Sequence, residues 1–81
     1  MSWTGKITKA VWADDNITIT VHFNDTVTNY NKDHDFVYPA DGTLTKAKLV
    51  TDVQAYGGIL AKNQTIYLAL QANIGTVINI P

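Results

Sequence analysis

The chain has 81 residues, a formal net charge of −1, 46% hydrophobic residues and no cysteine. This length and composition indicate a single globular domain over residues 1–81 and exclude wholesale disorder. The missing cysteine excludes disulfides, thiolate nucleophiles and cysteine-bound zinc or iron–sulfur clusters.

The charged residues are of few types. All seven acidic residues are Asp and all six basic residues are Lys, while Thr is the most frequent residue. Thr favours strands, Asp favours turns, and the absent Glu and Arg are helix formers, so this bias indicates a protein of strands and turns. Because Arg is the main side chain for bidentate phosphate and guanine recognition, and the net charge is small, we do not expect nucleic acid as a partner.

The sequence also gives no reason to expect a membrane. It has no apolar run near the ~20 residues that span a bilayer, and its first residues lack the basic and then apolar pattern of a signal peptide. We therefore expect a soluble protein that is made in the cytoplasm.

Residues 3–31 predict an antiparallel β-meander. A first strand from Trp3 ends at the turn-forming Asp14–Asn16, and residues 17–24 then alternate strictly between apolar and polar side chains. Asn24 and Asp25 tolerate a positive φ, so they predict a tight hairpin turn before a third strand over residues 26–30. A two-residue loop would place Tyr30 on the core face and a three-residue loop would place Val27 there; both registers stay open.

Residues 31–42 combine polar, apolar and turn-forming residues. Phe36-Val37-Tyr38 is a short apolar run, and the adjacent Pro39 restricts it to an edge strand. Residues 43–60 predict one helix packed on the sheet, with Thr43 as N-cap and helical spacing at Leu49, Val53, Tyr56 and Leu60. Gly57-Gly58 either ends this helix or permits close packing within it.

The C-terminal part is ambiguous. Residues 57–75 fit either a helix or a strand, because Ile66, Leu68 and Leu70 alternate while Ile66, Leu70 and Ile74 have helical spacing. Residues 76–80 predict a final strand. The expected fold class is therefore α+β, with a meander, one packed helix and a C-terminal strand.

Asp33-His34-Asp35 is the stretch with the strongest resemblance to a chemical site. In an extended chain the two carboxylates share one side and His34 points to the other, so the three cannot jointly bind a metal ion. We interpret this stretch chiefly as a polar connector after the meander, and metal or proton chemistry at His34 is the less favoured alternative.

The remaining candidates for catalysis are weak. His22 lies on the polar face of the best strand, Asp14-Asp15 occupies a predicted turn, and Gly57-Gly58 lacks the rest of a phosphate loop. Ser2 is the only serine and is not in a nucleophile elbow. We therefore expect neither enzymatic activity nor a cofactor or metal ion.

Aromatic and polar side chains instead suggest an interface. Trp3 and Trp12 are nine positions apart, so in one regular strand they would face opposite sides, and one of them would be available to a partner. The candidate interface residues are Trp3, Trp12, Thr18, Thr20, His22, His34 and Tyr38.

The order of the stretches WTGKIT, NITITVHFNDTVTNY and GTLTKAKLVTDVQAYGG, over about residues 3–62, resembles small virion or neck-region structural proteins of tailed bacteriophages. The resemblance implies a building block that contacts copies of itself or other virion proteins and becomes part of a virion. The expected function is protein–protein assembly, as a homo-oligomer or within a larger assembly. The alternative is a module that binds carbohydrate or another small ligand through aromatic and Asn/Asp side chains.

Overall fold

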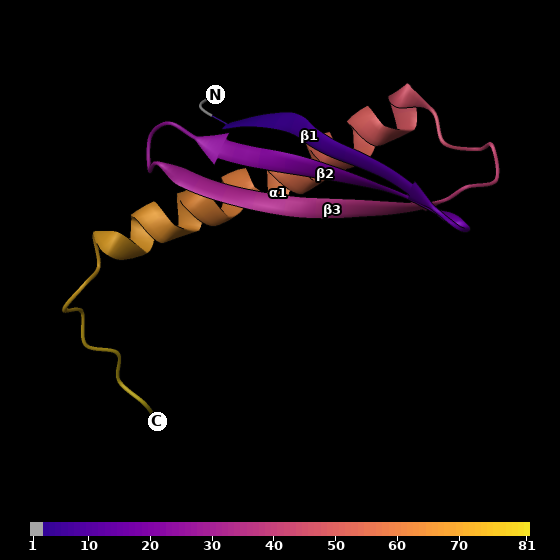
Figure 1. Cartoon of the computed structure of the whole chain (residues 1–81). Helices are drawn as coiled ribbons and strands as arrows, with labels where there is room; N and C mark the ends of the chain where they lie inside the picture. Colours follow the sequence, from indigo (N-terminus) through magenta and orange to yellow (C-terminus); the bar gives the residue numbers. More distant parts are fainter. Residues whose placement is uncertain (1–2) are drawn as a thin grey trace.

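The computed structural model describes residues 3–81, in which three strands precede one long helix (Figure 1). The strands β1 (Trp3–Ala13), β2 (Asn16–Asp25) and β3 (Tyr30–Pro39) form one antiparallel sheet in the order β1-β2-β3. The helix α1 (Lys46–Gln71) crosses one face of the sheet. The predicted α+β class with an N-terminal β-meander is confirmed.

The two hairpins differ in how well they were predicted. Asp14 takes a positive φ of 53° between β1 and β2, at the predicted turn. The turn predicted at Asn24-Asp25 is wrong, because Asp25 is fully buried and accepts hydrogen bonds from the backbone N and Oγ1 of Thr28. The chain turns at residues 26–29 instead, with Asn29 at a φ of 55°. Both proposed registers are therefore wrong, and Tyr30 pairs with Asp25.

This later turn changes the role of the next segment. β3 runs through the stretch that was interpreted as a polar connector, so Asp33-His34-Asp35 lies within a strand. The alternation argument for these residues is confirmed, since Asp33 and Asp35 share the open face of the sheet and His34 lies on the face that α1 covers. Pro39 is the last residue of β3, at the edge of the sheet as predicted.

A β-bulge decides the placement of the two tryptophans. The pairing of β1 with β2 shifts by one residue between Ile7 and Lys9. As a result Trp3 pairs with Asp25 and Trp12 with Ile17, two β2 residues on the same face of the sheet. The expectation that Trp3 and Trp12 face opposite sides is therefore wrong, because it assumed a regular strand.

The core lies between the sheet and the first half of α1. The alternating residues of β2 supply its centre, since Ile19, Val21 and Phe23 are buried. Tyr38 of β3 and two helix residues, Leu49 and Leu60, complete the buried cluster. Glycine permits the close approach of the two layers: a Cβ on Gly5 would lie 3.2 Å from a methyl of Val21 and from one of Val53.

The helix begins later and ends much later than predicted. Thr45 is the N-cap and accepts a hydrogen bond from the backbone N of Lys48, whereas Thr43 donates to Asp41 in the preceding turn. Gly57-Gly58 lies inside α1, so it does not end the helix; a Cβ on Gly57 would make an ordinary contact with the ring of Phe23 at 3.6 Å, and a Cβ on Gly58 would have no atom within 4 Å.

The predicted C-terminal strand is wrong. Because α1 continues to Gln71, it carries the chain past the end of the sheet, and within residues 3–81 no strand lies beside residues 76–80 for them to pair with (Figure 1). The molecule is correspondingly elongated, with extents of 54 × 32 × 19 Å and a radius of gyration of 17.1 Å. A compact chain of this length would have a radius of gyration of about 12 Å.

Candidate functional site

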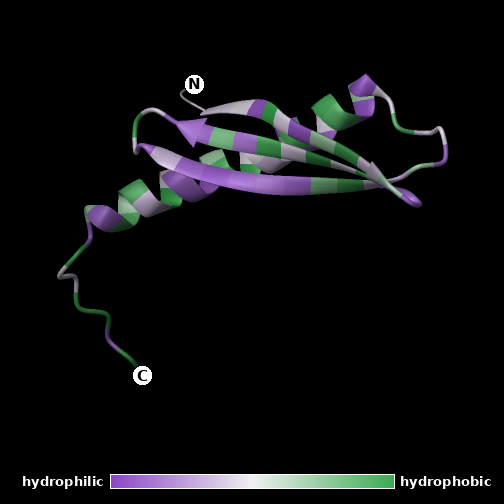
Figure 2. Ribbon diagram, in the orientation of Figure 1, coloured by the Kyte–Doolittle hydropathy of each residue, from purple (hydrophilic) through white to green (hydrophobic). Residues whose placement is uncertain are grey.

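The second half of α1 and the tail after it form an exposed apolar surface, which we name the C-terminal segment (residues 63–80). Four large residues of α1 are 46–62% exposed and four of the tail are 78–89% exposed: Ile66, Tyr67, Leu68, Leu70, Ile74, Val77, Ile78 and Ile80. The sequence has no charged side chain between Asn63 and Pro81. Figure 2 shows apolar positions along the last turns of α1 and along the tail, where no other element of the described chain covers them.

This surface is large enough for a stable contact. At roughly 150–250 Å² for a large side chain, these residues present on the order of 1,000 Å² of surface. A stable interface buries about 800 Å² from each partner. A helix that is apolar on most of its circumference is normally buried, so the C-terminal segment has the properties of a surface that is covered in an assembly.

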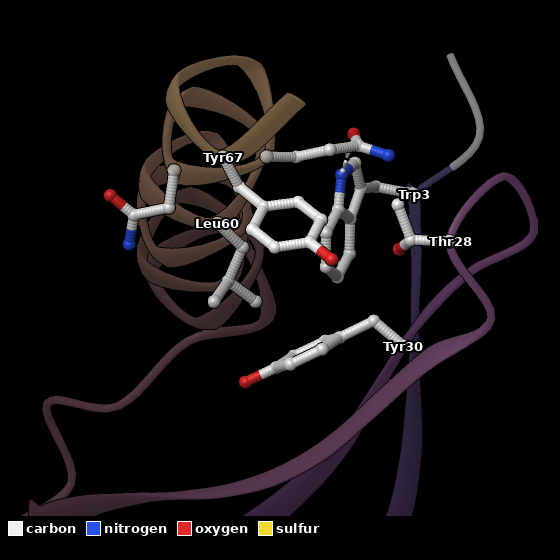
Figure 3. Close-up of a pocket in the computed structure, with 7 residues that line it drawn as sticks. Trp3, Thr28, Tyr30, Leu60 and Tyr67 are labelled. Atoms are coloured by element: carbon white, nitrogen blue, oxygen red, sulfur yellow. Dashed lines mark hydrogen bonds between the residues drawn. The ribbon is translucent and has the colours of Figure 1, made fainter. Parts of the chain in front are cut away.

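Where α1 passes the end of the sheet, an aromatic cleft of about 430 Å³ opens between the helix and the β2–β3 turn. Figure 3 shows Tyr67 and Leu60 of α1 facing Trp3 of β1 and Tyr30 of β3 across this cleft. The rings of Trp3 and Tyr30 make an edge-to-face contact at 5.7 Å. Thr28, Asn63 and Gln64 add neutral polar groups to the lining.

A hydrogen-bond network holds this end of the molecule together. Gln64 of α1 donates from Nε2 to the buried carboxylate of Asp25, at 2.5 Å, and accepts at Oε1 from the indole N–H of Trp3, at 2.8 Å. Asp25 also accepts both hydrogen bonds of Thr28. One glutamine thus connects the helix to two strands. Nothing in the local sequence marks Gln64, because its partners are 39 and 61 positions away.

The open face of the sheet carries a row of cross-strand polar pairs. Thr20 donates to Asp35 at 2.6 Å, and Nδ1 of His22 lies 2.7 Å from Oδ1 of Asp33. Nε2 of His22 lies 3.0 Å from Oδ1 of Asn31. Both ring nitrogens therefore face oxygen acceptors, which suits the doubly protonated ring. The hydrogen bond to Asp33, followed by that to Asn31, raises the pKa of His22.

His34 lies on the opposite face, beneath α1. Its ring stacks on Tyr56 at 4.1 Å and makes an edge contact with Phe36 at 4.8 Å. It is separated from the carboxylates of Asp33 and Asp35 by the sheet itself. Across residues 3–81, no group of three His or Asp side chains is arranged to hold a metal ion.

The remaining candidate interface residues are divided between core and surface. Tyr38 is a core residue whose hydroxyl donates to Asp52 at 2.7 Å, and burial, followed by this hydrogen bond, raises its pKa to about 12. Trp3 is half-buried by the Gln64 network. Trp12 is 78% exposed beside the first hairpin turn, and Thr18 is half-buried on the open face. The structure does not bring the seven residues together into one surface.

The sequence interpretation missed the C-terminal segment, although one signal was present. The absence of charge after Lys62 is visible in the sequence, but the spacing of the apolar residues leaves residues 57–75 open between helix and strand and predicts residues 76–80 as a strand of the sheet. No helix within residues 3–81 is both long and apolar enough to cross a membrane. No protein-family model, curated protein or solved structure matches the chain.

Proposed function

We propose that the chain is a non-enzymatic protein–protein assembly module, a small structural subunit of the kind found in tailed-bacteriophage virions. The observation that carries the proposal is the exposed, uncharged C-terminal segment. Covering it in an assembly removes on the order of 1,000 Å² of largely apolar surface from water, and the hydrophobic effect then favours association.

The distribution of charge indicates how the subunit would associate. All thirteen Asp and Lys side chains lie between Lys6 and Lys62, so contacts through the C-terminal segment bury no charge. An uncharged apolar surface can also face another copy of itself without repulsion, which favours a homo-oligomer.

Paired lysines test this function. The variant Ile66→Lys/Leu70→Lys places two positive charges four residues apart in the C-terminal segment. The control Thr51→Lys/Ala55→Lys adds the same charge at the same spacing on exposed residues of the first half of α1. Sedimentation velocity over a range of concentrations should show the wild type and the control as species larger than the 8.9 kDa monomer. The Ile66→Lys/Leu70→Lys variant should be monomeric. A wild type that is monomeric throughout, or a control that dissociates equally, would contradict the proposal.

The virion assignment has its own test, which is the genomic neighbourhood. A gene beside capsid, portal or tail genes supports the assignment to a virion. A gene among metabolic genes contradicts it and leaves the assembly function to be judged by sedimentation alone.

The aromatic cleft supports a second candidate function, the binding of a neutral carbohydrate. Sugar rings stack on Trp and Tyr faces, and the Asn63 and Thr28 groups provide hydrogen bonds without charge. Trp12→Phe removes the tryptophan outside the cleft, so fluorescence then reports on Trp3. Titration with neutral oligosaccharides should shift this emission, and Tyr67→Ala should abolish the shift. Unchanged emission with every oligosaccharide would rule out this function.

A further inference from the structure

The outer edge of β1 is an open strand edge. β1 pairs with β2 on one side, and within residues 3–81 no strand lies on its other side. The bulge between Ile7 and Lys9 interrupts the strand and leaves a regular first stretch, Trp3–Ile7. An open edge presents backbone N–H and C=O groups that can pair with an added strand. The first stretch can therefore accept about five residues.

Beside this edge lies a second cavity, of about 270 Å³, between β1 and α1. Gly5 of β1 and Gly57 and Gly58 of α1 contribute to its lining without side chains. A Cβ built on Gly58 has no atom within 4 Å. Tyr56 on the other flank of α1 stacks on His34 of β3, so the flank with Gly58 is the one nearer β1. The cavity can therefore receive an apolar side chain from a strand on the β1 edge.

The tail has the properties of such a strand. Residues 76–80, Thr-Val-Ile-Asn-Ile, lie outside any helix or strand and contain three β-branched apolar residues. In an extended conformation Thr76, Ile78 and Ile80 share one side, and Val77 and Asn79 lie on the other. The two isoleucines suit the α1 cavity on one side of the β1 edge, and Asn79 suits the polar open face of the sheet on the other. The tail also points away from its own sheet (Figure 1).

We propose that residues 76–80 of a second copy add as a fourth strand to the β1 edge along Trp3–Ile7, with an isoleucine side chain in the cavity beside Gly58. The inference rests on the assembly function proposed above and names its partner as another copy of this chain. Each copy gives one tail and receives one. Such a head-to-tail contact builds a closed ring, or a filament where the rotation does not close.

Filling the cavity tests the docking site. Gly58→Leu adds a side chain where a Cβ has open space, so the fold should persist, and circular dichroism checks this. Gly58→Ala is the matched control. We expect Gly58→Leu to weaken association at least tenfold, measured by sedimentation, and Gly58→Ala to associate within threefold of the wild type. A folded Gly58→Leu variant that associates like the wild type would overturn the inference.

Disulfide cross-linking tests whether the tail of a second copy occupies the β1 edge. The sequence has no native cysteine, so only introduced cysteines can form a disulfide. Thr4→Cys lies on the acceptor edge, and Asn79→Cys lies on the tail side that would face the open face of the sheet. A mixture of the two single variants under mild oxidation should form disulfide-linked heterodimers in preference to homodimers. In the double variant, a disulfide within the monomer would show that a chain binds its own tail and would overturn the inference.

The two proposals fail in different ways. If Ile66→Lys/Leu70→Lys dissociates the assembly while Gly58→Leu does not, the assembly function stands and the strand addition is wrong. If the wild type is monomeric at every concentration, both are wrong.

Discussion

Replacing Gln64 by Met tests whether one polar side chain fixes the helix on the sheet. Met has nearly the same length and volume as Gln but cannot donate to Asp25 or accept from Trp3. The variant therefore removes two hydrogen bonds while it retains most of the packing. Because the carboxylate of Asp25 is fully buried, water cannot replace the lost donor without opening this end of the molecule.

The expected cost follows from the two bonds. A hydrogen bond contributes about 0.5–1.5 kcal/mol, and removing one partner of a buried polar group costs about 1–3 kcal/mol. Gln64 is only partly buried, so we expect the lower part of the sum, a loss of about 2–3 kcal/mol. A domain of this size is stable by roughly 4–12 kcal/mol, so the loss is a large share of the total.

Urea unfolding followed by circular dichroism measures this loss. The wild type and the variant should be compared at one fixed protein concentration, since association adds to apparent stability. Lys62→Met is the control, because Lys62 is an exposed residue of similar length in the same helix and lies outside both cavities. A loss of unfolding free energy below about 0.5 kcal/mol, or one equal to that of the control, would refute the reasoning. A substitution at an ordinary exposed position has an effect of that size.

Three further predictions concern other parts of the fold. Gly5→Ala should destabilise the protein by about 1–3 kcal/mol, because the added methyl would press on Val21, Val53 and Phe23. Gly58→Ala should instead stabilise α1 by up to about 1 kcal/mol, because Ala has the higher helix propensity. Equal effects of the two substitutions in urea unfolding would contradict the packing described. The raised pKa of His22 means that its interaction with Asp33 stabilises the fold below pH 6.5 and that this contribution is lost as pH rises through the raised value. NMR should give a His22 titration midpoint above 6.5, and His22→Gln should remove this part of the pH dependence; a midpoint at or below 6.5 counts against the pairing. A spectrophotometric titration should give Tyr38 a pKa of about 12, and stability should be lost between its ordinary pKa of 10.0 and this raised pKa. Because burial is the largest cause of the shift, Asp52→Asn should leave the pKa of Tyr38 above 10.0. A return to 10.0 would show that burial is not the main cause.

The sequence predicts those parts of the fold that depend on a local pattern of apolar and polar residues. The alternation of residues 17–24 places Ile17, Ile19, Val21 and Phe23 on one apolar face; the last three are buried, and Ile17 is partly buried against them. The second turn was not predictable in the same way, because the residue before it, Asp25, is buried and accepts a hydrogen bond from Gln64, which is 39 positions away in the helix. The bulge in β1 also lacks a local signal, yet it determines the face on which Trp12 lies.

The C-terminal segment could be predicted only in part. Ile66, Leu68 and Leu70 alternate as in a strand, while Ile66, Leu70 and Ile74 have helical spacing, and all four side chains are exposed rather than packed on the sheet. For residues 76–80 the usual inference, that an apolar β-branched stretch is a strand in the sheet of its own chain, was wrong. The sequence does show that the C-terminal segment has no charged side chain, and this property supports a role in contacts between protein chains.

Hydrogen exchange of the wild-type protein at low and high concentration tests the central claim most directly. Residues 76–80 have no secondary structure in a single chain, so their amides should exchange at nearly the rate of a free peptide when the protein is dilute. If the C-terminal segment is the assembly surface, concentration should slow the exchange of these amides and of the last turns of α1 by at least about 100-fold. Fast exchange of residues 76–80 at every concentration, with unchanged exchange in the last turns of α1, would contradict it.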